Sequence, residues 1–550
     1  MKKIILGFFL LAVAGSETNA QPLTGTQMAD SVTLVAAGCY NLQGCYVVPS
    51  GKVLTIQAGT VIRCSPASNL VVERGGVIVA QGTPSNQIVF TSNQPIGDRK
   101  PADWGSLIIM GKAKNNVINN GGGVKAISRC GNTYLGGGID DLDNSGVLKY
   151  IRLEYAGGGI STDNEKSALI LNSVGSGTTI DHVQITESAE NGLSIFGGTV
   201  NFLNGYILDA YKNDVLVNLG YRGTISGLLT MRKNPAAHHP FGSNGLLVWN
   251  NDVNDLFEPL TQPEVLNCSI IGIKHCYSGT PHTDFKDGIR IDNNGGGNYY
   301  NNVITGYNEY GLFINDAASA DRTKNPPLTG NLNFSYNSMT NNGSGDYANG
   351  AFTWSSYGCG TTMTNWIKGL SSIGCEESGN QFSPFALKYD ASFCSDFCVS
   401  NFSSNFVLDP TTALEDPNYD DLDVSVELDY RGAVQGTSVF DSWITVCPQN
   451  QVYCSLEMKR EVQEKKSSLI IIPNPAKGQA SLSFDAKSFG QAKVLILDKV
   501  TGRVLYQKEI TIKNIGEQTI SISLNGLTQG VYPIRVQMKD AVINGMISVQ

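Results

Sequence analysis

From residue 53 onward the sequence repeats one short pattern, in which four or five residues of alternating apolar character are followed by glycine or asparagine. Equivalent segments recur about every two dozen residues, at residues 167–170, 192–195 and 213–216 and again at 288–291 and 311–314. The alternation indicates β-strands, and a repeat of about 20–50 residues is typical of a solenoid. Because no helical pattern separates the strands, the repeat predicts a parallel β-helix whose stacked coils bury one column of Ile, Val and Leu.

The corners of such coils need special residues. Asparagine, serine and glycine should occupy them, where they supply left-handed backbone and hydrogen bonds from one coil to the next. We expect a right-handed coil, since right-handed crossovers are the rule for parallel strands. A β-propeller is the main alternative, but it needs four-stranded blades of about 40–45 residues with a blade motif, and we find none. After about residue 234, cysteine-containing insertions make the pattern less regular.

The composition agrees with an all-β, turn-rich body. The 550 residues include 61 glycines, and only 16% of the residues are charged. The formal net charge of −9 is unevenly distributed, at +1 for residues 1–20, −14 for residues 21–467 and +4 for residues 468–550. An acidic body disfavours nucleic acid or an anionic membrane surface as a partner.

The first 20 residues have the layout of a cleavable secretory signal peptide. Lys2 and Lys3 precede an apolar run at residues 4–14, and small residues at 18–20 precede Gln21. The mature chain should therefore begin near Gln21. No later segment approaches the roughly 18 apolar residues of a membrane-spanning helix, so we expect no transmembrane segment in the exported protein.

Residues 469–550 indicate a second, smaller β-domain. The apolar strand 470–472 ends at a Pro-Asn-Pro turn, and because proline cannot donate to a β-ladder, a new strand must start after it. Further alternating segments, bounded by Gly, Asp or Asn, lie at residues 480–484, 493–497, 503–506, 520–524 and 530–536. We expect a β-helix body at 21–455, a charged linker at 456–468 and a C-terminal β-sandwich at 469–550.

The turn motifs of this domain resemble those of the C-terminal sorting domain of proteins exported by the type IX secretion system (Por secretion system) of Bacteroidota. The matching residues are Pro473, Asn474, Pro475, Gly478, Asp498, Gly502, Gly530 and Tyr532. Pro533 and the C-terminal residues 544–550, which lack a basic side chain, depart from the pattern. The resemblance implies export through the periplasm to the outer-membrane surface or the medium, with the secretion machinery as a partner. The alternative is an ordinary carbohydrate-binding or adhesive β-sandwich.

The body also contains segments that resemble a group of exported Bacteroidota β-helix proteins. They lie at residues 56–62, 75–83, 88–92, 103–113, 135–150 and 196–201, and the resemblance weakens beyond residue 223. Residues 429–433 and Trp443 look like the closing coil of that group. The resemblance implies a fold and an export route, but no reaction.

All twelve cysteines follow the signal peptide, and an even number in a chain that crosses an oxidising compartment favours disulfides. They are Cys39, Cys45, Cys64, Cys130, Cys268, Cys276, Cys359, Cys375, Cys394, Cys398, Cys447 and Cys454. Short loops suggest three pairs, although the sequence alone does not determine the connectivity. These pairs are Cys39 with Cys45, Cys268 with Cys276, and Cys447 with Cys454. A zinc site at Cys394 and Cys398 is the alternative, but it lacks a second close cysteine pair or a suitably spaced histidine.

Three carboxylates in one loop suggest calcium as the one possible cofactor. Asp140, Asp141 and Asp143 lie within a glycine-flanked segment, and their oxygens are the ligands that calcium prefers. The same residues are ordinary turn formers. The pattern also has neither the bidentate Glu of an EF-hand nor the repeat of a nonapeptide calcium roll.

Polysaccharide cleavage on a β-helix would need paired carboxylates, or a basic residue beside a bound uronate. Two sets of residues are candidates: Asp181, Glu187 and Glu190 on adjoining coils, and Asp284, Asp287, Arg290 and Asp292 around one strand. Alternation sends Arg290 and Asp292 to the face opposite Ile289, and an outward Arg–Asp face is also typical of solvated surface. We find no signature of a known lyase or glycosidase.

Histidines and aromatic residues offer weaker signals. His238 and His239 could supply two imidazoles to a metal, but neighbours on a strand point to opposite faces, so such a pair seldom binds one ion. Six aromatic residues could form either a sugar-stacking strip or structural ladders between coils. They are Tyr299, Tyr300, Tyr307, Tyr310, Trp354 and Tyr357. We therefore expect a secreted or cell-surface protein that is structural, adhesive or glycan-binding, with a polysaccharide lyase or glycoside hydrolase as the alternative.

Overall fold

The chain forms two compact units, residues 1–454 and residues 455–550, and each is described by itself. The computed structural model describes residues 20–36, 38–158, 166–324, 332–370, 375, 377, 379–383, 387–389, 406–408, 430–433, 443–445, 447–454, 469–486, 490–499, 501–512, 516–538 and 542–550. Nearly all of the predicted signal peptide, the predicted linker 456–468, and Cys394 and Cys398 lie outside these residues.

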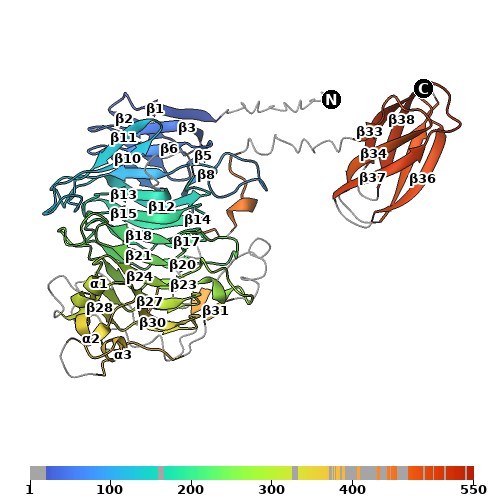
Figure 1. Cartoon of the computed structure of the whole chain (residues 1–550). Coiled ribbons are helices and arrows are strands. Elements are labelled where there is room, and N and C mark those ends of the chain that lie inside the picture. Colours follow the sequence, from blue (N-terminus) through green and yellow to red (C-terminus); the bar gives the residue numbers. More distant parts are fainter. Residues whose placement is uncertain are drawn as a thin grey trace, which may run out of the picture. The chain divides into compact units, whose positions relative to one another are not determined.

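The first unit is the predicted all-β parallel β-helix (Figure 1), a 28-stranded parallel sheet wound into coils. Its strands form three columns, which we call A, B and C in the order in which the chain visits them. Column A contains β2 (Ser31–Leu34), β4 (Val53–Gln57), β7 (Val77–Gln81), the first halves of β12 (Gly146–Glu154) and β14 (Thr179–Thr186), β16 (Asn201–Leu203), β19 (Thr224–Ser226), β22 (Glu264–Leu266), β25 (Gly297–Tyr300) and β28 (Leu332–Ser335).

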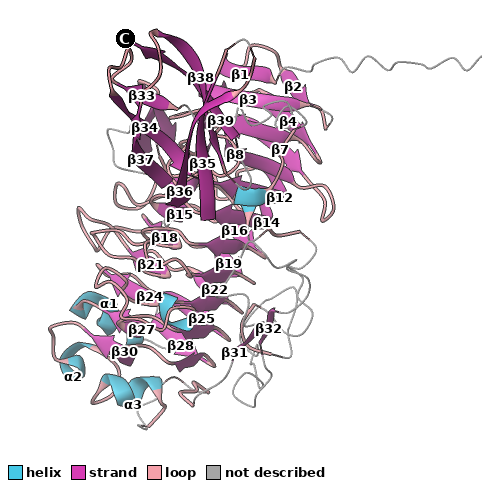
Figure 2. Ribbon diagram, turned by 90° about the vertical axis from the view of Figure 1, so that its right-hand side faces the viewer, coloured by secondary structure: helices cyan, strands magenta, loops and turns pink. Residues whose placement is uncertain are grey.

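Columns B and C complete each coil. Column B contains the first half of β3 (Cys39–Val48), β5 (Val61–Cys64), β8 (Ile88–Ser92), the second halves of β12 and β14, β17 (Tyr206–Leu208), β20 (Leu229–Met231), β23 (Ser269–Ile271), β26 (Val303–Thr305) and β29 (Ser338–Thr340). Column C contains the second half of β3, β6 (Asn69–Val72), β9 (Leu107–Met110), β13 (Ser167–Asn172), β15 (Asn191–Phe196), β18 (Val215–Asn218), β21 (Leu246–Trp249), β24 (Ile289–Asp292), β27 (Tyr310–Ile314) and β30 (Gly345–Asn349). β1 (Gln21–Thr26) pairs with β3 in the first coil, and Figure 2 shows columns A and C as separate stacks of strands.

The inward side chains of the three columns form one continuous core. In column C the register stacks Leu193, Val215, Leu246, Ile289 and Leu312 directly on one another, and each of these side chains is buried. A single apolar cluster extends from Leu23 in the first coil to Ile367 beyond the last. Burial of one row per coil stabilises the stack because a coil alone has no partner for its apolar face.

Asparagine ladders join successive coils at the corners, as predicted. Asn244 donates to Asn213, and Asn213 donates to Asn191, each from the side-chain amide at 2.9 Å. At another corner Asn302 donates to Asn337 at 2.9 Å. These buried amides are therefore satisfied by the coil above or below.

An insertion covers the outer face of column C in the first coils. The antiparallel hairpin β10 (Lys125–Arg129) and β11 (Asn132–Gly136) places Ile127 and Tyr134 against Val71, Ile108 and Ile170, in a second apolar cluster outside the coil. The sequence repeat did not predict this hairpin.

Short helices close the other end of the β-helix (Figure 2). These elements are α1 (Ala317–Asp321), η2 (Arg322–Lys324), α2 (Trp354–Tyr357) and α3 (Met363–Ile367). Trp354 and Trp366 are buried against the last coil, and a disulfide joins Cys359 to Cys375. The remaining elements of this unit are η1 (Ile273–His275), β31 (Leu387–Tyr389), β32 (Phe406–Leu408) and η3 (Pro448–Asn450).

The described parts of residues 430–454, which we call the return segment, lie along the outside of the coils. The amide of Ala433 donates to Ser269 at 2.9 Å, the amide of Thr445 donates to Gln184 at 2.9 Å, and Cys454 forms a disulfide with Cys39. The segment thus runs from the last coils back to the first, rather than forming the closing coil that the sequence suggested.

The predicted cysteine pairs are wrong. Cys39 and Cys45 lie on two consecutive sides of one coil, so they pair elsewhere, with Cys454 and Cys130 respectively. Cys268 points into the core and is a free thiol, as is Cys64. Cys276 and Cys447 are both disulfide-bonded, but not to the predicted partners. Local spacing misled the prediction because the partners lie on segments outside the coils, with Cys454 on the return segment and Cys130 in the turn between β10 and β11.

The second unit is the predicted β-sandwich. One sheet has the order β33 (Ile470–Ile472), β34 (Gln479–Ala486), β37 (Gly516–Ser523), and the other has the order β36 (Val504–Ile512), β35 (Gly490–Leu497), β38 (Gly530–Gln537), β39 (Val542–Val549). Leu482, Val494, Val536 and Ile547 are among the side chains buried between them. The last strand, β39, was not among the predicted strands.

Candidate functional site

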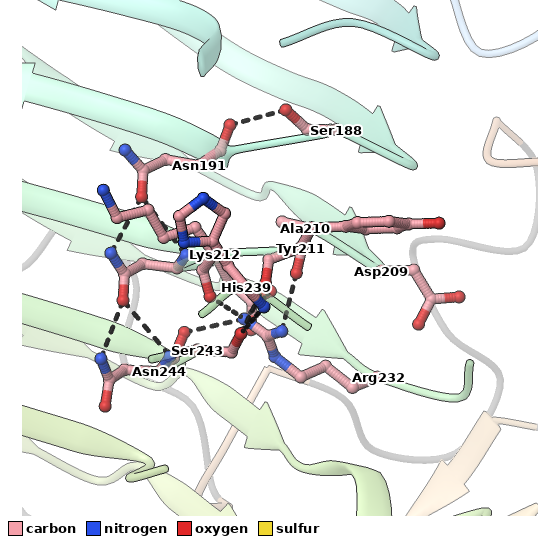
Figure 3. A network of polar contacts seen from close by, with 12 residues as sticks. Ser188, Asn191, Asp209, Ala210, Tyr211, Lys212, Arg232, His239, Ser243 and Asn244 are labelled. Carbon is pink, nitrogen blue, oxygen red and sulfur yellow. Dashed lines mark hydrogen bonds and ion pairs between the residues drawn. The ribbon is translucent and has the colours of Figure 1, made fainter. Parts of the chain in front are cut away.

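Titratable side chains gather at one corner of the β-helix, where the chain passes from column B to column C. We call this the loop corner because it carries the long loops 93–106, 232–245 and 272–288. Every coil enters column C at the same edge, so residues from loops far apart in sequence stack on one another there. Figure 3 shows this corner around Asp209, Arg232 and His239.

A buried ion pair holds the corner together. The Arg232 guanidinium donates to the carbonyls of Ala210, Lys212 and Asn244 at 2.7, 2.9 and 2.9 Å (Figure 3) and lies 3.1 Å from Asp214. Both charged side chains are completely buried, and burial raises the pKa of Asp214 to about 7, although Arg232 opposes this rise. Arg232 therefore fixes the backbone of the turn before β18 and of the loop before β21.

Two carboxylates and a lysine follow the ends of three stacked column B strands. Glu187 comes after β14, Asp209 after β17 and Lys233 shortly after β20. Glu187 and Asp209 have left-handed backbone, with φ of 54° and 53°, and the Glu187 amide donates to the Leu208 carbonyl at 2.9 Å. The amide of Lys233 donates to the Asp209 carboxylate at 2.8 Å. The register thus stacks Glu187 on Asp209, and Lys233 lies one residue beyond the position that stacks on Asp209.

Burial shifts the pKa values of this group toward neutral pH. It raises the pKa of Glu187 to about 7, Asp209 adds to the rise, and Lys233 opposes it. Burial also raises the pKa of Asp209 and lowers that of Lys233. A raised carboxyl pKa and a lowered lysine pKa both move toward the values that general acid–base chemistry uses.

His238 and His239 diverge, although they lie in the loop 232–245 and not on the strand that the prediction assumed. Nε2 of His239 lies 3.5 Å from Glu190, which also lies 4.0 Å from Lys212. Nδ1 of His238 instead lies 3.1 Å from Asp284, a residue of the next coil. Sequence reasoning missed this contact because the two residues are 46 positions apart.

The first set of candidate catalytic residues is not brought together. Glu187 and Glu190 lie at the loop corner, but Asp181 lies at the opposite end of β14. Burial tends to raise the pKa of Asp181, yet hydrogen bonds from His182, Asn204 and Lys149 outweigh it and hold that pKa well below its usual range. Asp181 is therefore a firmly ionised structural carboxylate.

The second set lies partly on the outer face of column C. Arg290 lies between Asp287 and Asp292, at 3.2 and 3.1 Å, and burial raises the pKa of Asp287 to about 6. The Arg290 guanidinium lies 4.8 Å from the ring centre of Phe313, which stacks on Tyr310 with centroids 5.5 Å apart. Asp284 belongs to the loop corner instead.

Pairing along column C places these side chains in rows. Leu247, Arg290 and Phe313 occupy paired positions on successive strands, and Trp249 pairs with Asp292. All five side chains are partly exposed. We call Leu247, Trp249, Arg290, Asp292, Tyr310 and Phe313 the column C face.

The predicted aromatic strip divides between core and surface. Tyr299, Tyr307 and Trp354 are buried in the core and are structural. Tyr310 is part of the column C face, and Tyr357 contacts Phe352 near the end of the β-helix. A continuous sugar-stacking strip of these residues is therefore not formed.

The three loop aspartates are each engaged by the protein. Asp141 accepts a hydrogen bond from Arg222 at 3.0 Å, Asp143 accepts from the Ser145 hydroxyl at 3.0 Å, and Asp140 accepts from the Leu142 amide at 3.2 Å. In the part of the chain that the structure describes, these carboxylates do not converge on one point. Calcium binding here stays a prediction that this geometry does not favour.

The sorting-motif residues lie in turns of the C-terminal sandwich, except for Gly530 and Tyr532, which lie in β38. Asp498 accepts from the amide and hydroxyl of Thr501 at 2.7 and 2.8 Å, and the Asn474 side chain accepts from the Ser548 amide at 2.8 Å. Gly478 and Gly502 have positive φ, at 74° and 70°, which favours glycine. Pro473 and Pro475 follow cis peptide bonds, Gly530 begins β38, and the Tyr532 hydroxyl donates to the Thr528 carbonyl at 2.8 Å.

Each of the two units matches a known protein family. Residues 470–550 match the secretion system C-terminal sorting domain, which directs the chain through the type IX secretion system to the cell surface or the medium. None of the described helices has the length and apolar character needed to span a membrane. No curated protein and no solved structure matches the chain. Residues 25–371 match the pectate-lyase like beta helix domain, and the chain therefore belongs to that family.

Proposed function

We propose that this exported β-helix protein binds a glycan on the column C face. The observation that carries the proposal is the combination there of Trp249, Tyr310 and Phe313 with the Arg290 and Asp292 pair. Aromatic rings offer flat apolar surfaces to sugar rings, and charged groups that are already oriented can hydrogen-bond to hydroxyls.

The geometry of the face suits an extended polymer. Strands of column C repeat about every 4.8 Å along the coil axis, so contacts on successive coils form a linear series. The net charge of −14 for residues 21–467 favours a neutral glycan over a polyanionic one, because a polyanion would be repelled. Retention at the cell surface by such binding would make the protein adhesive.

Loss of an aromatic residue tests the proposal. We expect Trp249→Ala or Phe313→Ala to weaken binding of neutral polysaccharides about fivefold, since an aromatic contact contributes about 1 kcal/mol. Phe241→Ala is the matched control, because Phe241 is 85% exposed and lies outside the column C face. Affinity electrophoresis against a polysaccharide panel measures the effect. Equal weakening in all three variants, or no binding by the unmodified protein, would contradict the proposal.

The second candidate is polysaccharide cleavage at the loop corner, favoured by the shifted pKa values of Glu187 and Lys233. A lyase would remove a proton beside a uronate carboxylate and release an unsaturated sugar, whereas a hydrolase would release a reducing end. Ultraviolet absorbance and reducing-end assays distinguish the two products. We would then expect Glu187→Gln to abolish turnover and Glu190→Gln to preserve it, and no turnover by the unmodified protein on any substrate would exclude this candidate.

A further inference from the structure

Three side chains from two successive coils converge at the loop corner. Nδ1 of His238 lies 3.1 Å from Oδ2 of Asp284, and Nδ1 of His282 lies 3.2 Å from the same oxygen. One ligand atom from each residue lies within 4.8 Å of the others, and this is the one such group of three among the residues that the structure describes. We propose that His238, His282 and Asp284 bind a divalent transition-metal ion of the zinc class.

The two nitrogen–oxygen separations are close to those that an ion would impose. Zinc binds imidazole nitrogen at about 2.0–2.1 Å and carboxylate oxygen at about 2.0–2.2 Å, which in a tetrahedral site places neighbouring ligand atoms about 3.4 Å apart. The observed nitrogen–oxygen distances of 3.1 and 3.2 Å differ from this by a few tenths of an ångström. The half-exposed His282 side chain is the ligand that would rotate to complete the site.

The two imidazoles lie face to face, and because a metal lies in the plane of each imidazole that it binds, one ring would turn out of this stack when an ion binds. Their rings stack with centroids 4.1 Å apart and an interplanar angle of 9°, and Nδ1 of each ring lies next to the carboxylate. The Asp284 amide donates to Nδ1 of His282 at 3.2 Å, so that nitrogen presents a lone pair, the form that a metal needs. A bound ion would replace this long hydrogen bond.

The backbone holds the two loops in place before any ion binds. Ser243 and Phe285 form a parallel β-bridge between the loops that carry His238 and Asp284. The Ser243 amide donates to the Asp284 carbonyl at 2.7 Å, and its hydroxyl accepts from the His239 amide at 3.0 Å. The His238 ring packs edge-on against the buried Phe285. A site on ordered backbone binds with less loss of conformational entropy than one on a free loop.

The donor set selects the class of ion. Two imidazole nitrogens suit Zn²⁺, Co²⁺, Ni²⁺ or Cu²⁺, whereas Ca²⁺ and Mg²⁺ prefer oxygen ligands. With three protein ligands, and with the His282 side chain 52% exposed, a fourth position would face solvent and hold water or a ligand group. The site is therefore of the open type, and it is independent of the proposed glycan binding.

Metal titration of the purified full chain without a histidine tag tests the proposal. We expect one Zn²⁺ or Co²⁺ per chain by calorimetry and by elemental analysis after dialysis, with Co²⁺ giving the visible absorption of a nitrogen–oxygen site. His282→Ala and Asp284→Asn should each weaken binding at least tenfold. The half-exposed His282 makes its variant suitable for a folding check by circular dichroism.

His239→Ala is the matched control. This histidine neighbours the site in sequence, but its Nε2 faces Glu190, so its loss should change metal affinity less than twofold. Excess Ca²⁺ should not displace Co²⁺. The proposal is overturned if the unmodified chain binds no stoichiometric Zn²⁺ or Co²⁺, if the three variants bind equally, or if Ca²⁺ competes effectively.

Discussion

Two corners of the same coil differ in how much the length of their connections varies. At the corner between columns A and B, two residues separate the strands in each of five successive coils, from β16 and β17 to β28 and β29. At the loop corner, from the second coil onward, the connection varies from the four residues 306–309 to the 17 residues 272–288. The first corner, which we call the tight corner, keeps a fixed turn length, and the second varies in length and carries the loops with the candidate metal and acid–base residues.

The tight corner has the same length in successive coils because its backbone takes the same conformation in each of them. Its first residue has left-handed φ in coil after coil: Tyr150 at 50°, His182 at 54°, Asn204 at 51°, Gly227 at 65°, Asn267 at 50°, Asn301 at 57° and Tyr336 at 58°. Because the turn keeps two residues, it offers no inserted residues that could add functional side chains. The comparison teaches that the coil varies the length of its connections at one corner and keeps it fixed at the other.

Inserting one residue should give the largest difference in stability between the two corners. One glycine between Asn301 and Asn302 would displace the asparagine ladder and shift the register of β26, so we expect a loss of stability of about 5 kcal/mol or more, or no folding. One glycine between Pro235 and Ala236, in the loop corner, should cost less than about 1 kcal/mol. Urea unfolding followed by circular dichroism measures both, and similar losses would remove the distinction.

Removing one ladder residue should have the next largest effect. Asn337 is completely buried; it accepts from Asn302 and donates to the Tyr299 carbonyl at 2.8 Å, so Asn337→Leu leaves several buried groups unpaired. We expect a loss of about 3–5 kcal/mol in the free energy of unfolding. Asn234→Ala, at the loop corner, is the control and should lose about 1 kcal/mol or less. A small effect of Asn337→Leu would show that the ladder is not structural.

The disulfide between Cys39 and Cys454 tests whether the return segment stabilises the stack. Its cysteines are 415 residues apart in sequence, so replacing both with serine should lower stability by about 2–5 kcal/mol. Removal of the Cys359–Cys375 disulfide, which spans 16 residues, is the comparison and should cost less. The two losses are measured by thermal unfolding under non-reducing conditions. The reverse order would indicate that the return segment contributes little.

The pH dependence of stability should have opposite signs at the two corners. Glu187, at the loop corner, has a pKa raised from 4.5 to about 7, so the folded state holds its proton longer and stability falls as the pH rises through this range. Glu187→Gln should therefore gain about 2–3 kcal/mol relative to the unmodified protein between pH 4.5 and pH 8.

Asp181, at the tight corner, provides the opposite case. Its lowered pKa means that it stabilises the folded state above about pH 3.8 and that this contribution is lost as the pH falls further. Asp181→Asn should therefore be less stable than the unmodified protein at neutral pH, with the difference shrinking in acid. Unfolding free energies across pH measure both variants. The same sign in both would contradict the assigned environments.

The strands and corners, which repeat locally, could be predicted from the sequence. The contacts between coils of different length could not. Alternation located the strands, and asparagine marked the corners. Leu246 and Ile289 pair although they are 43 residues apart, whereas Ile289 and Leu312 pair at 23. Because the loop lengths vary, no fixed spacing brings His238 to His282 in the sequence, or Cys39 to Cys454. The same uncertainty in register hid which tyrosines face the core.

Native-state hydrogen exchange, read by mass spectrometry, tests the division between the corners most directly. We predict slow exchange of amides at the tight corner, in residues 298–305 and 335–340, because they are buried and bonded between coils. We predict much faster exchange in the loop-corner residues 235–242 and 276–284. Equal protection in both sets, or fast exchange at the tight corner, would contradict the account.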